Sequence, residues 1–406
     1  MTRAAGAVVI GGGLAGCALA RELAGRGLAV IVFERGHVGR EASAAAAGFV
    51  SPQADFARDG PLFRLGLASR AAYPRWVRAI ARESGLDPAL RRHGVVWAAT
   101  THADARALGA RLVWQRRLGL RARRLSLRGA RALVPGLSGP LRGAAFFPDD
   151  LSIDNERLVV ATALAARRGG ARIVEGTSVH GVVARGGRVV GVRTDRGLTA
   201  APVVINAAGA WAAGIAMPRG AAAPAVTPVR GQMVVLGGLR CVVGRPVHAT
   251  EVYFAPRPDG RLLVGSTYER VGFDKRPTAH AVRTLLGAAE RLVPSVAGAT
   301  LLGAYAGLRP GTPDELPIVG AADEVSGLWY ACGLYRNGVL LAPAVAAALA
   351  DLVTDGVTRW PVAALAPGRF GRAASLNRRT SPRAPRAGRP GRRRSSPDSR
   401  RTPRLR

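Results

Sequence analysis

The feature that most constrains the fold is a glycine-rich turn near the N-terminus. A short apolar run at residues 7–10 leads into GGGLAG at residues 11–16, and the apolar side chains over residues 14–26 have helical spacing. A second apolar run at residues 29–33 ends at Glu34. A strand, a tight turn, a helix and a second strand in this order predict a βαβ unit with parallel strands.

Each glycine of this turn has a physical role in binding a dinucleotide. Gly11 permits the turn, Gly13 lets a pyrophosphate approach the backbone, and Gly16 lets the helix pack closely on the strand. The helix N-terminus offers free N–H groups and a positive potential to the phosphates. Glu34 can accept hydrogen bonds from both hydroxyls of an adenosine ribose, and an acid there disfavours a 2′-phosphate. The alternative interpretation is an ordinary glycine-rich turn of an α/β protein.

The turn alone does not decide between NAD and FAD. The pattern continues with Ala20 and Gly27, which gives GxGxxG-x3-A-x6-G. This longer spacing resembles the FAD-binding fingerprint of flavoprotein oxidoreductases, and an N-terminal position also suits FAD. The same segment has the early Arg and the apolar run of a signal peptide, but the glycine pattern explains it better.

The composition excludes several classes of protein. With 406 residues, 48% of them hydrophobic, the chain can bury a core in two domains or in one elaborate domain. The three cysteines are far apart and form no CxxC motif, which argues against disulfides or a zinc site and fits a reducing, cytoplasmic location. The histidines show no ligand spacing, so we expect no metal. No other run approaches the roughly 18 apolar residues of a membrane span.

The basic charge of the chain is concentrated at its C-terminal end. The formal net charge is +33, and residues 367–406 contribute 14 Arg against a single acid, Asp398. This tail has almost no apolar side chains to bury, so we expect it to be disordered. It could tether nucleic acid or a membrane, or it could be a dispensable solvated extension, which is the interpretation that we prefer.

Local patterns predict several further elements. Residues 62–84 have helical periodicity with a break expected at Pro74, and residues 103–134 are expected to add more helix. Apolar strands on both sides of residues 257–260 predict a β-hairpin. A long apolar helix is expected to begin at Gly338.

Several further stretches together resemble one family, the glycine oxidase branch of the D-amino-acid-oxidase-like FAD-dependent oxidoreductases. The resemblance covers about residues 5–355 and leaves out the basic tail. The stretches that carry it are EASAAAAGFVSPQAD at 41–55, VVINAAGAWA at 203–212, VGSTYERVGFDK at 264–275, GLRPGTPDELPIVG at 307–320 and GLYRNGVLLAP at 333–343.

The resemblance implies an α/β fold, a Rossmann-like FAD-binding domain with an inserted α+β substrate domain built on a mixed or antiparallel sheet. Both domains would be assembled from separate segments of the chain. The expected boundaries are 1–77, 146–216 and 306–366 for the FAD-binding domain, 78–145 and 217–305 for the substrate domain, and 367–406 for the tail.

The activity that the resemblance implies is the oxidation of glycine, or of another small amine or D-amino acid, by hydride transfer from Cα to flavin N5. The products would be an imine and then a keto acid, ammonia and H2O2, with O2 as the second substrate, and such enzymes supply thiamine thiazole biosynthesis. Two alternatives stay open. One is a D-amino-acid dehydrogenase that uses a quinone acceptor, and the other is a flavoprotein that acts on the carboxymethylaminomethyl group of a modified tRNA.

The resemblance also implies site residues. The substrate would be held by Arg309, the main carboxylate clamp, by Arg336 beside it, and by Tyr253 and Tyr268. Arg suits this role because its planar fork matches the two oxygens of a carboxylate. The residues expected to contact FAD are Gly11, Gly13, Leu14, Ala15, Gly16, Glu34, Arg35, Ala42, Ser43, Ala47, Gly48, Phe49, Val179, Ala208, Gly209, Trp211, Gly333, Leu334, Arg336, Asn337, Gly338, Val339 and Leu340.

The sequence departs from the family at two positions near the expected site. Leu334 stands where the family usually has His, and Tyr305 stands where Trp is common, so the preferred amine is left open. Cys332 does not match the position of the covalent flavin link of sarcosine oxidases, so we expect non-covalent FAD. Family members are often tetramers, and the subunit number stays open here. Nucleic acid is not expected as a partner, although the basic tail keeps that alternative open.

Overall fold

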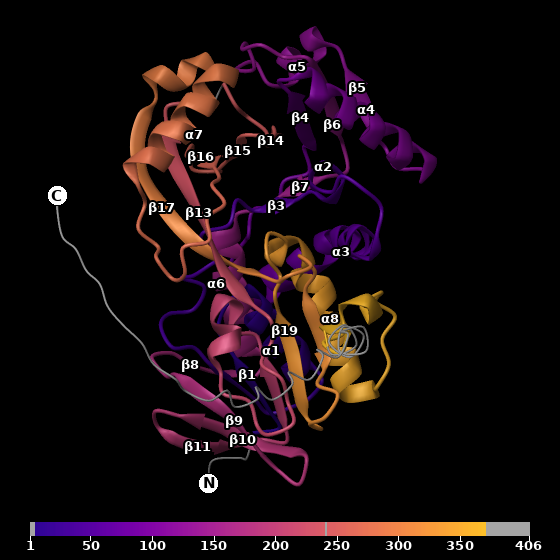
Figure 1. Cartoon of the computed structure of the whole chain (residues 1–406), viewed down its shortest axis with the longest axis vertical. Helices are drawn as coiled ribbons and strands as arrows, with labels where there is room; N and C mark the ends of the chain where they lie inside the picture. The colour runs from indigo at the N-terminus through magenta and orange to yellow at the C-terminus, as the bar shows by residue number, and fades with distance from the viewer. Residues whose placement is uncertain (1–4, 240–241, 371–406) are drawn as a thin grey trace, which may run out of the picture. The chain divides into compact units, whose positions relative to one another are not determined.

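Residues 5–239 and 242–370 of the chain are described by a computed structural model, in which two large β-sheets organise the fold (Figure 1). The α/β class expected from the sequence is confirmed. The tail that was expected to be disordered lies, from residue 371 onward, outside the described residues.

The first sheet contains the predicted βαβ unit. Its strands, in spatial order, are β18 (Ile318–Ala321), β19 (Leu328–Cys332), β12 (Val203–Asn206), β1 (Ala7–Ile10), β2 (Val30–Phe33) and β8 (Arg172–Val174). All neighbours are parallel except β18 and β19. Strand β1 lies between β12 and β2 and is buried at every position, which explains why its sequence is continuously apolar. Helix α1 (Leu14–Gly25) connects β1 to β2, as predicted.

The second sheet is mixed, as expected. Its strands, in spatial order, are β17 (Thr300–Gly311), β13 (Thr227–Gly237), β16 (Leu262–Gly265), β15 (Tyr253–Pro256), β14 (Val247–His248), β4 (Val95–Ala99), β6 (Gly143–Phe147) and β5 (Arg123–Leu125). Only β14 and β4 are parallel neighbours. The predicted hairpin at residues 257–260 is confirmed, because it joins antiparallel β15 to β16. The exact domain boundaries stay a prediction.

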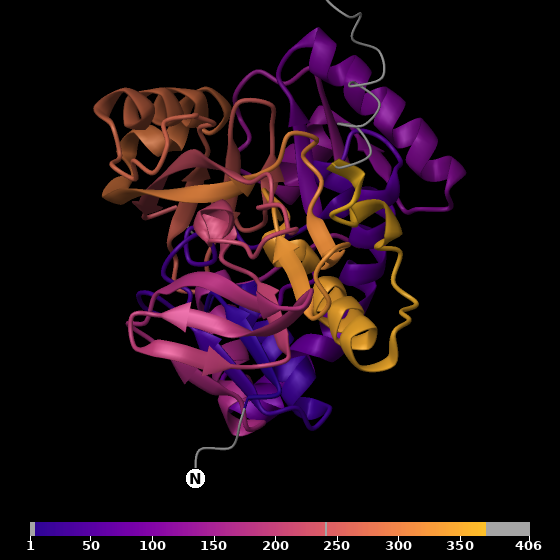
Figure 2. The same cartoon turned by 60° about the horizontal axis from the view of Figure 1, so that its bottom comes forward.

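Within the described ranges, two smaller sheets and three 3₁₀ segments accompany the large sheets. A three-stranded sheet, which lies in front in Figure 2, contains β9 (Val179–Arg185), β10 (Arg188–Thr194) and β11 (Gly197–Ala200). A two-stranded sheet pairs β3 (Phe49–Val50) with β7 (Leu151–Ser152). The 3₁₀ segments are η1 (Gly209–Gly214), η2 (Pro294–Gly298) and η3 (Ala363–Leu365).

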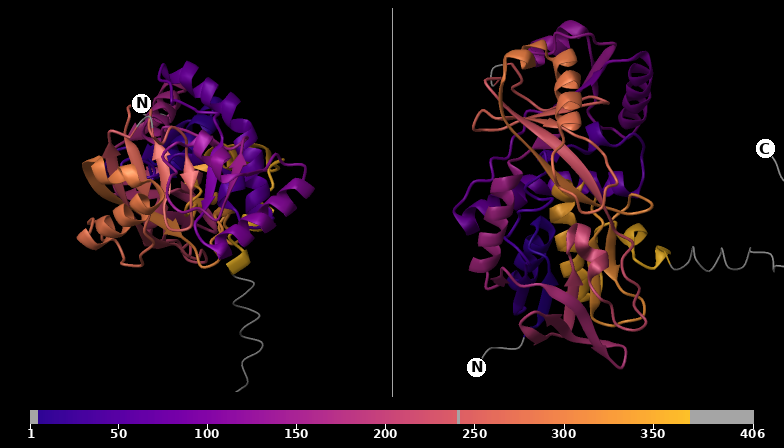
Figure 3. Two further views of the ribbon diagram at one scale, coloured as in Figure 1. Left: turned by 90° about the horizontal axis from the view of Figure 1, so that it is seen from above. Right: turned by 60° about the vertical axis from the view of Figure 1, so that its left-hand side comes forward.

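The helices divide between the two large sheets, as two views in Figure 3 show. Helix α1 packs against α6 and α8, helix α3 packs against the same two helices, and α7 packs against β13 and β16. Apart from α1, the helices are α2 (Pro52–Asp55), α3 (Pro61–Ser84), α4 (His102–Arg117), α5 (Leu127–Leu133), α6 (Asn155–Arg168), α7 (Ala279–Leu292) and α8 (Gly338–Asp355).

Two local predictions were wrong. Pro74 was expected to break a helix, but α3 continues through it. A proline costs a helix one backbone hydrogen bond, and here the buried side chains of Tyr73, Trp76 and Val77 on either side keep α3 packed against its neighbours. Helix was also expected throughout residues 103–134, but β5 lies between α4 and α5 and joins the edge of the second sheet. Sheet pairing overrode local periodicity there.

Helix α8 is apolar because it lies in the core. Among residues 5–239 and 242–370, it is the one helix that is long and apolar enough to cross a membrane, and 61% of it is buried inside the protein. Contacts with α1, α3, β18 and β3 contribute to this burial. Its start at Gly338 is the start that the sequence predicted.

Candidate active site

A cavity of about 330 Å³ lies where the two large sheets meet. Its walls include the turn between β1 and α1, the loop at residues 42–49, and the residues after β12 and β19. It therefore lies at the carboxyl ends of the parallel strands, where open α/β sheets bind their ligands. The second sheet supplies the opposite wall from β13, β14, β15, β16 and β17.

The glycine turn is shaped by close backbone contacts. A Cβ on Gly16 would lie 1.9 Å from the carbonyl oxygen of Gly11, and a Cβ on Gly11 would lie 2.6 Å from the carbonyl oxygen of Ala207. Gly13 is the N-cap of α1 and has no side chain to cap the helix, so the first turn of α1 faces the cavity through backbone groups. This is the arrangement that a pyrophosphate requires.

Glu34 is held rigidly beside the glycine turn. It follows β2, is 9% exposed, and accepts hydrogen bonds from the backbone N–H of Gly12 at 2.7 Å through Oε2 and of Gly36 at 2.9 Å through Oε1. These two bonds fix the carboxylate at the end of the turn. Each carboxylate oxygen keeps a second lone pair, so both can still accept from the hydroxyls of a ribose.

The alanine-rich loop at residues 42–48 is held from behind by two polar side chains. The Asn155 side chain donates to the carbonyl oxygens of Ser43 at 2.7 Å and Ala44 at 2.9 Å. The buried Arg257 guanidinium donates to the carbonyl oxygen of Ala46 at 3.1 Å and to Asn155. The loop therefore presents small side chains to the cavity from a fixed backbone. From the sequence, Arg257 was assigned only to a hairpin turn.

The start of α8 forms another wall and is held by α3. Pro343 lies inside α8 and has no N–H to donate to the carbonyl oxygen four residues earlier, that of Val339. The Tyr73 hydroxyl donates to this carbonyl instead, and the Ser69 hydroxyl donates to Leu340 O at 2.6 Å. The N-terminus of α8, with its positive dipole end, is thus fixed at the cavity.

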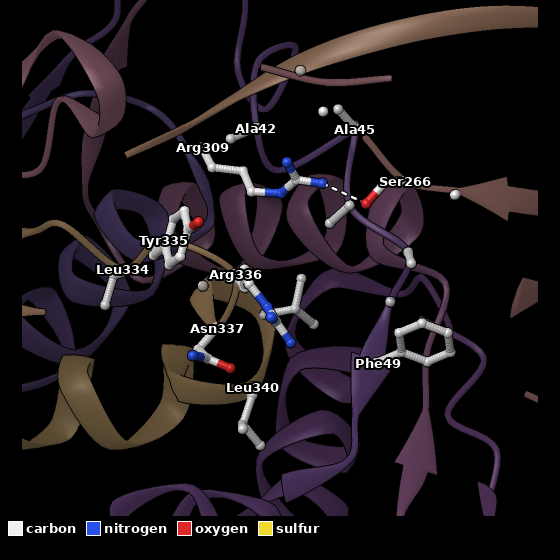
Figure 4. Close-up of a pocket in the computed structure, with 18 of the residues that line it drawn as sticks. Ala42, Ala45, Phe49, Ser266, Arg309, Leu334, Tyr335, Arg336, Asn337 and Leu340 are labelled. Atoms are coloured by element: carbon white, nitrogen blue, oxygen red, sulfur yellow. Dashed lines mark hydrogen bonds between the residues drawn. The ribbon is translucent and has the colours of Figure 1, made fainter. Parts of the chain in front are cut away.

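Arg309 is rigidly oriented in the cavity. Its Nη1 donates to the carbonyl oxygens of Thr267 at 3.0 Å and Arg230 at 3.4 Å, and its Nη2 donates to Ser266 Oγ at 2.6 Å (Figure 4). An arginine side chain has five N–H donors. Two of them therefore remain free for an acceptor such as a carboxylate, as far as the described residues show.

Glycines on the second sheet make room for the polar side chains of the cavity. A Cβ on Gly231 of β13 would lie 2.2 Å from Nη2 and 2.3 Å from Cζ of Arg309, so the guanidinium lies flat against this backbone. A Cβ on Gly265 of β16 would lie 2.7 Å from the hydroxyl oxygen of Tyr253. The sequence analysis did not single out either glycine, because neither belongs to a recognisable turn motif.

Arg336 has a carboxylate partner within the chain. Its Nη2 forms an ion pair with Asp55, at the end of α2. The Asp55 carboxylate holds the pKa of Arg336 well above its ordinary value. Arg309 and Arg336 lie 4.5 and 5.7 Å from the Tyr268 ring centre, so both guanidiniums approach one aromatic ring. The geometry thus gives Arg336 a different anion from the substrate carboxylate that we had expected.

A buried polar network positions α2. The Asp150 carboxylate accepts from the backbone N–H of Ala54 at 2.8 Å and pairs with Arg70 at 2.6 Å. The Gln115 side chain donates to Gln53 O at 2.8 Å. Complete burial raises the pKa of Asp150 to about 6, although Arg70 opposes the shift. The network fixes the α2 backbone, and with it Asp55, independently of any ligand.

Two other titratable side chains line the cavity in neutral form. Burial lowers the pKa of His248 to about 4, and its Nε2 has no hydrogen-bond partner among the described residues. Its ring centre lies 4.3 Å from that of Phe49. Burial raises the pKa of the Cys332 thiol to about 12. Neither group carries charge at neutral pH.

Most of the residues expected from the sequence gather at this cavity. Those that line it are Gly13, Leu14, Ala15, Ala42, Ser43, Ala47, Gly48, Phe49, Gly209, Tyr253, Tyr268, Arg309, Leu334, Arg336, Asn337, Gly338, Val339 and Leu340. Lining residues that the sequence analysis missed include Ser51, Asp55, Gly231, Met233, His248, Gly265, Ser266, Gly307 and Tyr335. Asp55 is the last residue of the stretch at 41–55 that carried part of the resemblance. Its charge was the feature of the sequence that could have marked it as a site residue.

Some expected residues do not line the cavity. These are Gly11, Gly16, Glu34, Arg35, Val179, Ala208, Trp211 and Gly333. The first three shape the turn beside it, as described above. The Arg35 guanidinium lies 3.6 Å from the Trp211 ring centre, and Trp211 stacks on Phe273, so these side chains contact one another. Their roles toward a cofactor stay predictions.

The cavity as a whole fits a long, flat dinucleotide cofactor. A glycine turn with an acid beside it lies at one part of the wall, a loop of alanines covers another, and the start of α8 closes a third. Small side chains leave room for a planar ring, and the N-terminal end of α1, with its positive dipole end, lies at the cavity wall.

Comparisons with known proteins agree with this geometry. The chain is 37% identical over 348 residues to the glycine oxidase of Pseudomonas aeruginosa, covering 86% of this chain and 94% of that protein. The crystal structure of glycine oxidase from Geobacillus kaustophilus superposes with a TM-score of 0.87 at 34% identity, covering 91% of this chain and 99% of that one. The bifunctional protein ThiO/ThiG of Synechocystis is 35% identical over 376 residues, and the chain spans 54% of its length.

The family description "FAD dependent oxidoreductase" (DAO) matches residues 7–352, which include the glycine turn, both large sheets and the start of α8. The match extends over most of the chain and over every wall of the cavity. The chain therefore belongs to the DAO family of FAD-dependent oxidoreductases.

Proposed function

We propose that this protein oxidises glycine, or another small amino acid of that kind, to an imine that water then hydrolyses to a keto acid and ammonia. The observation that carries the proposal is Arg309, a cavity residue held by three hydrogen bonds, with two of its N–H donors unpaired among residues 5–239 and 242–370. The similarity to glycine oxidases over most of the chain supports the substrate class.

The residues of the chain act mainly by binding and orienting the substrate. Arg309 would hold the carboxylate through two parallel charge-assisted hydrogen bonds, which fix both position and orientation. Tyr253 lines the same cavity, and burial raises the pKa of its hydroxyl, so it keeps its proton and can donate to the same carboxylate. Both roles are those that the family resemblance implied for these residues.

Bound FAD supplies the two-electron acceptor for this oxidation. The residues that would hold it are the turn at 11–16, the loop at 42–48, and the first turn of α8. The α8 N-terminus adds a fixed positive potential at its end of the cavity. The neutral His248 and Cys332 add no competing charge.

We further propose O2 as the final electron acceptor, which gives H2O2, and a place in the supply of an imine or keto acid to thiamine synthesis. The similarity to the ThiO/ThiG protein supports that pathway. A panel of glycine, sarcosine and small D-amino acids, assayed for H2O2 in air, tests the proposal. Turnover with glycine or sarcosine is expected. A yellow, FAD-bound protein that oxidises no small amino acid, with either O2 or an artificial acceptor, would overturn it.

A further inference from the structure

Within the part of the chain that the structure describes, two guanidiniums line the cavity, and only that of Arg309 is free to bind a substrate anion. Arg309 donates only to uncharged oxygens, those of two carbonyls and a hydroxyl. Arg336 instead pairs with Asp55, and both residues of that pair line the cavity. In Figure 4 the two guanidiniums lie one above the other, with Arg336 on the side of α8. An ion pair in the cavity wall affects how many negative charges a bound substrate can carry.

Asp55 is a fixed partner rather than a mobile surface side chain. The Asp55 side chain is 17% exposed, compared with 39% for Arg336. The α2 backbone that carries it is tied down from the opposite side, since Asp150 accepts from Gln53 N–H and Ala54 N–H and the Arg111 guanidinium donates to Ala54 O. The carboxylate therefore stays beside Arg336 whether or not a substrate is present.

We propose that Asp55 determines specificity, by occupying Arg336 so that the enzyme accepts amines with one carboxylate and rejects those with two. This inference rests on the proposed function and refines its substrate class. A second carboxylate on the substrate would approach the Asp55–Arg336 pair and meet a like charge next to a cation that is already neutralised. With the charge of Asp55 removed, Arg336 would become a second free fork for a carboxylate.

The other charged groups around the cavity do not replace Asp55 in this role. Arg111 donates to a backbone carbonyl and lies against the Trp97 ring, 5.3 Å from its centre. Glu251 also lines the cavity, but its carboxylate pairs with Arg291 at 2.5 Å and is 63% exposed. Only Asp55 combines a charge, a fixed backbone and direct contact with a cavity arginine among the described residues.

The test compares two substrates that differ by one carboxylate. Sarcosine is N-methylglycine, and iminodiacetate is the same secondary amine with a carboxylate on the methyl carbon. For wild type we expect a low ratio of kcat/KM for iminodiacetate to kcat/KM for sarcosine. In Asp55→Asn, which keeps the side-chain volume, the ratio should rise by about tenfold or more, the effect of one charge-assisted hydrogen bond pair.

Three variants make the result specific. Adding Arg336→Gln to Asp55→Asn should return the ratio to the wild-type value, because the gain depends on that guanidinium. Asp59→Asn removes an Arg–Asp pair, with Arg64, in the same part of the chain but outside the cavity, and should leave the ratio unchanged. Asp55→Ala should behave as Asp55→Asn does. An unchanged ratio in both Asp55 variants, with melting temperatures near that of wild type, overturns the inference.

A binding measurement separates this inference from the proposed function. Acetate and malonate, which are not oxidised, can be titrated against the visible absorption of the bound flavin. Malonate should gain affinity relative to acetate in Asp55→Asn by about tenfold, and equal relative affinities in the variant and wild type would refute the role of Asp55. If wild type bound acetate but oxidised no small amino acid, the proposed function would fail while this result still decided the inference.

Discussion

Substitution of Gly231 by Ala should weaken substrate binding, and should do so only by displacing Arg309. A Cβ at this position would lie 2.2 Å from Nη2 and 2.3 Å from both Cζ and Nη1, whereas ordinary contact begins at 3.4 Å. The guanidinium therefore has to move by about 1 Å, which disturbs its hydrogen bonds to Ser266 Oγ and Thr267 O and its fit to the substrate carboxylate. Two weakened charge-assisted bonds to the substrate correspond to about 1.5–3 kcal/mol.

These values predict an increase in the KM for glycine of about 10-fold to 100-fold, with a much smaller change in kcat. The affinity for acetate, measured from the flavin absorption, should fall by a similar factor. Gly303→Ala is a matched control, because Gly303 lies on the neighbouring strand β17 and nothing lies within 4 Å of its Cβ position. If Gly231→Ala kept the KM and the acetate affinity of this control, Arg309 would not be the carboxylate clamp.

Three further substitutions test other parts of the structure. The pKa of His248 is about 4 in the folded protein and is expected to be near the usual 6.5 in the unfolded chain. Between these two pH values the unfolded state binds an additional proton, so wild type should lose stability as the pH falls from 6.5 towards 4. His248→Phe should therefore melt progressively higher than wild type from pH 7 to pH 5, and a constant difference would contradict this. Asp150→Asn leaves Arg70 without its buried carboxylate, although the Gln53 side chain still accepts from it, and urea unfolding should show a loss of about 3–5 kcal/mol; under 1 kcal/mol would refute the network. Gly16→Ala would place a Cβ 1.9 Å from Gly11 O, so FAD affinity, from titration of apoprotein, should fall at least about tenfold, and an unchanged affinity would contradict the proposed cofactor site.

Short-range patterns predicted the elements that local sequence controls. The strand, turn and helix at residues 7–26 follow from glycine positions and apolar spacing, and the hairpin at 257–260 follows from its Pro-Asp-Gly turn. Prediction failed at β5 and at Pro74 of α3, where tertiary contacts overrode the local pattern. The partner of β5 is β6, whose paired residues lie 19–23 positions further on, and α3 packs against α8, which lies still further along the chain, so a short local window contains neither partner.

By itself, the sequence determined that the chain has a dinucleotide-binding βαβ unit, an apolar helix from Gly338, and an arginine at position 309 beside a strand end. Only the tertiary structure decided how the two arginines are used. Arg309 lies against Gly231 on another strand, and Arg336 meets Asp55 across 281 residues of sequence. Hydrogen bonds and ion pairs depend on distances of a few ångströms in space, and only the packing of the two sheets fixes those distances.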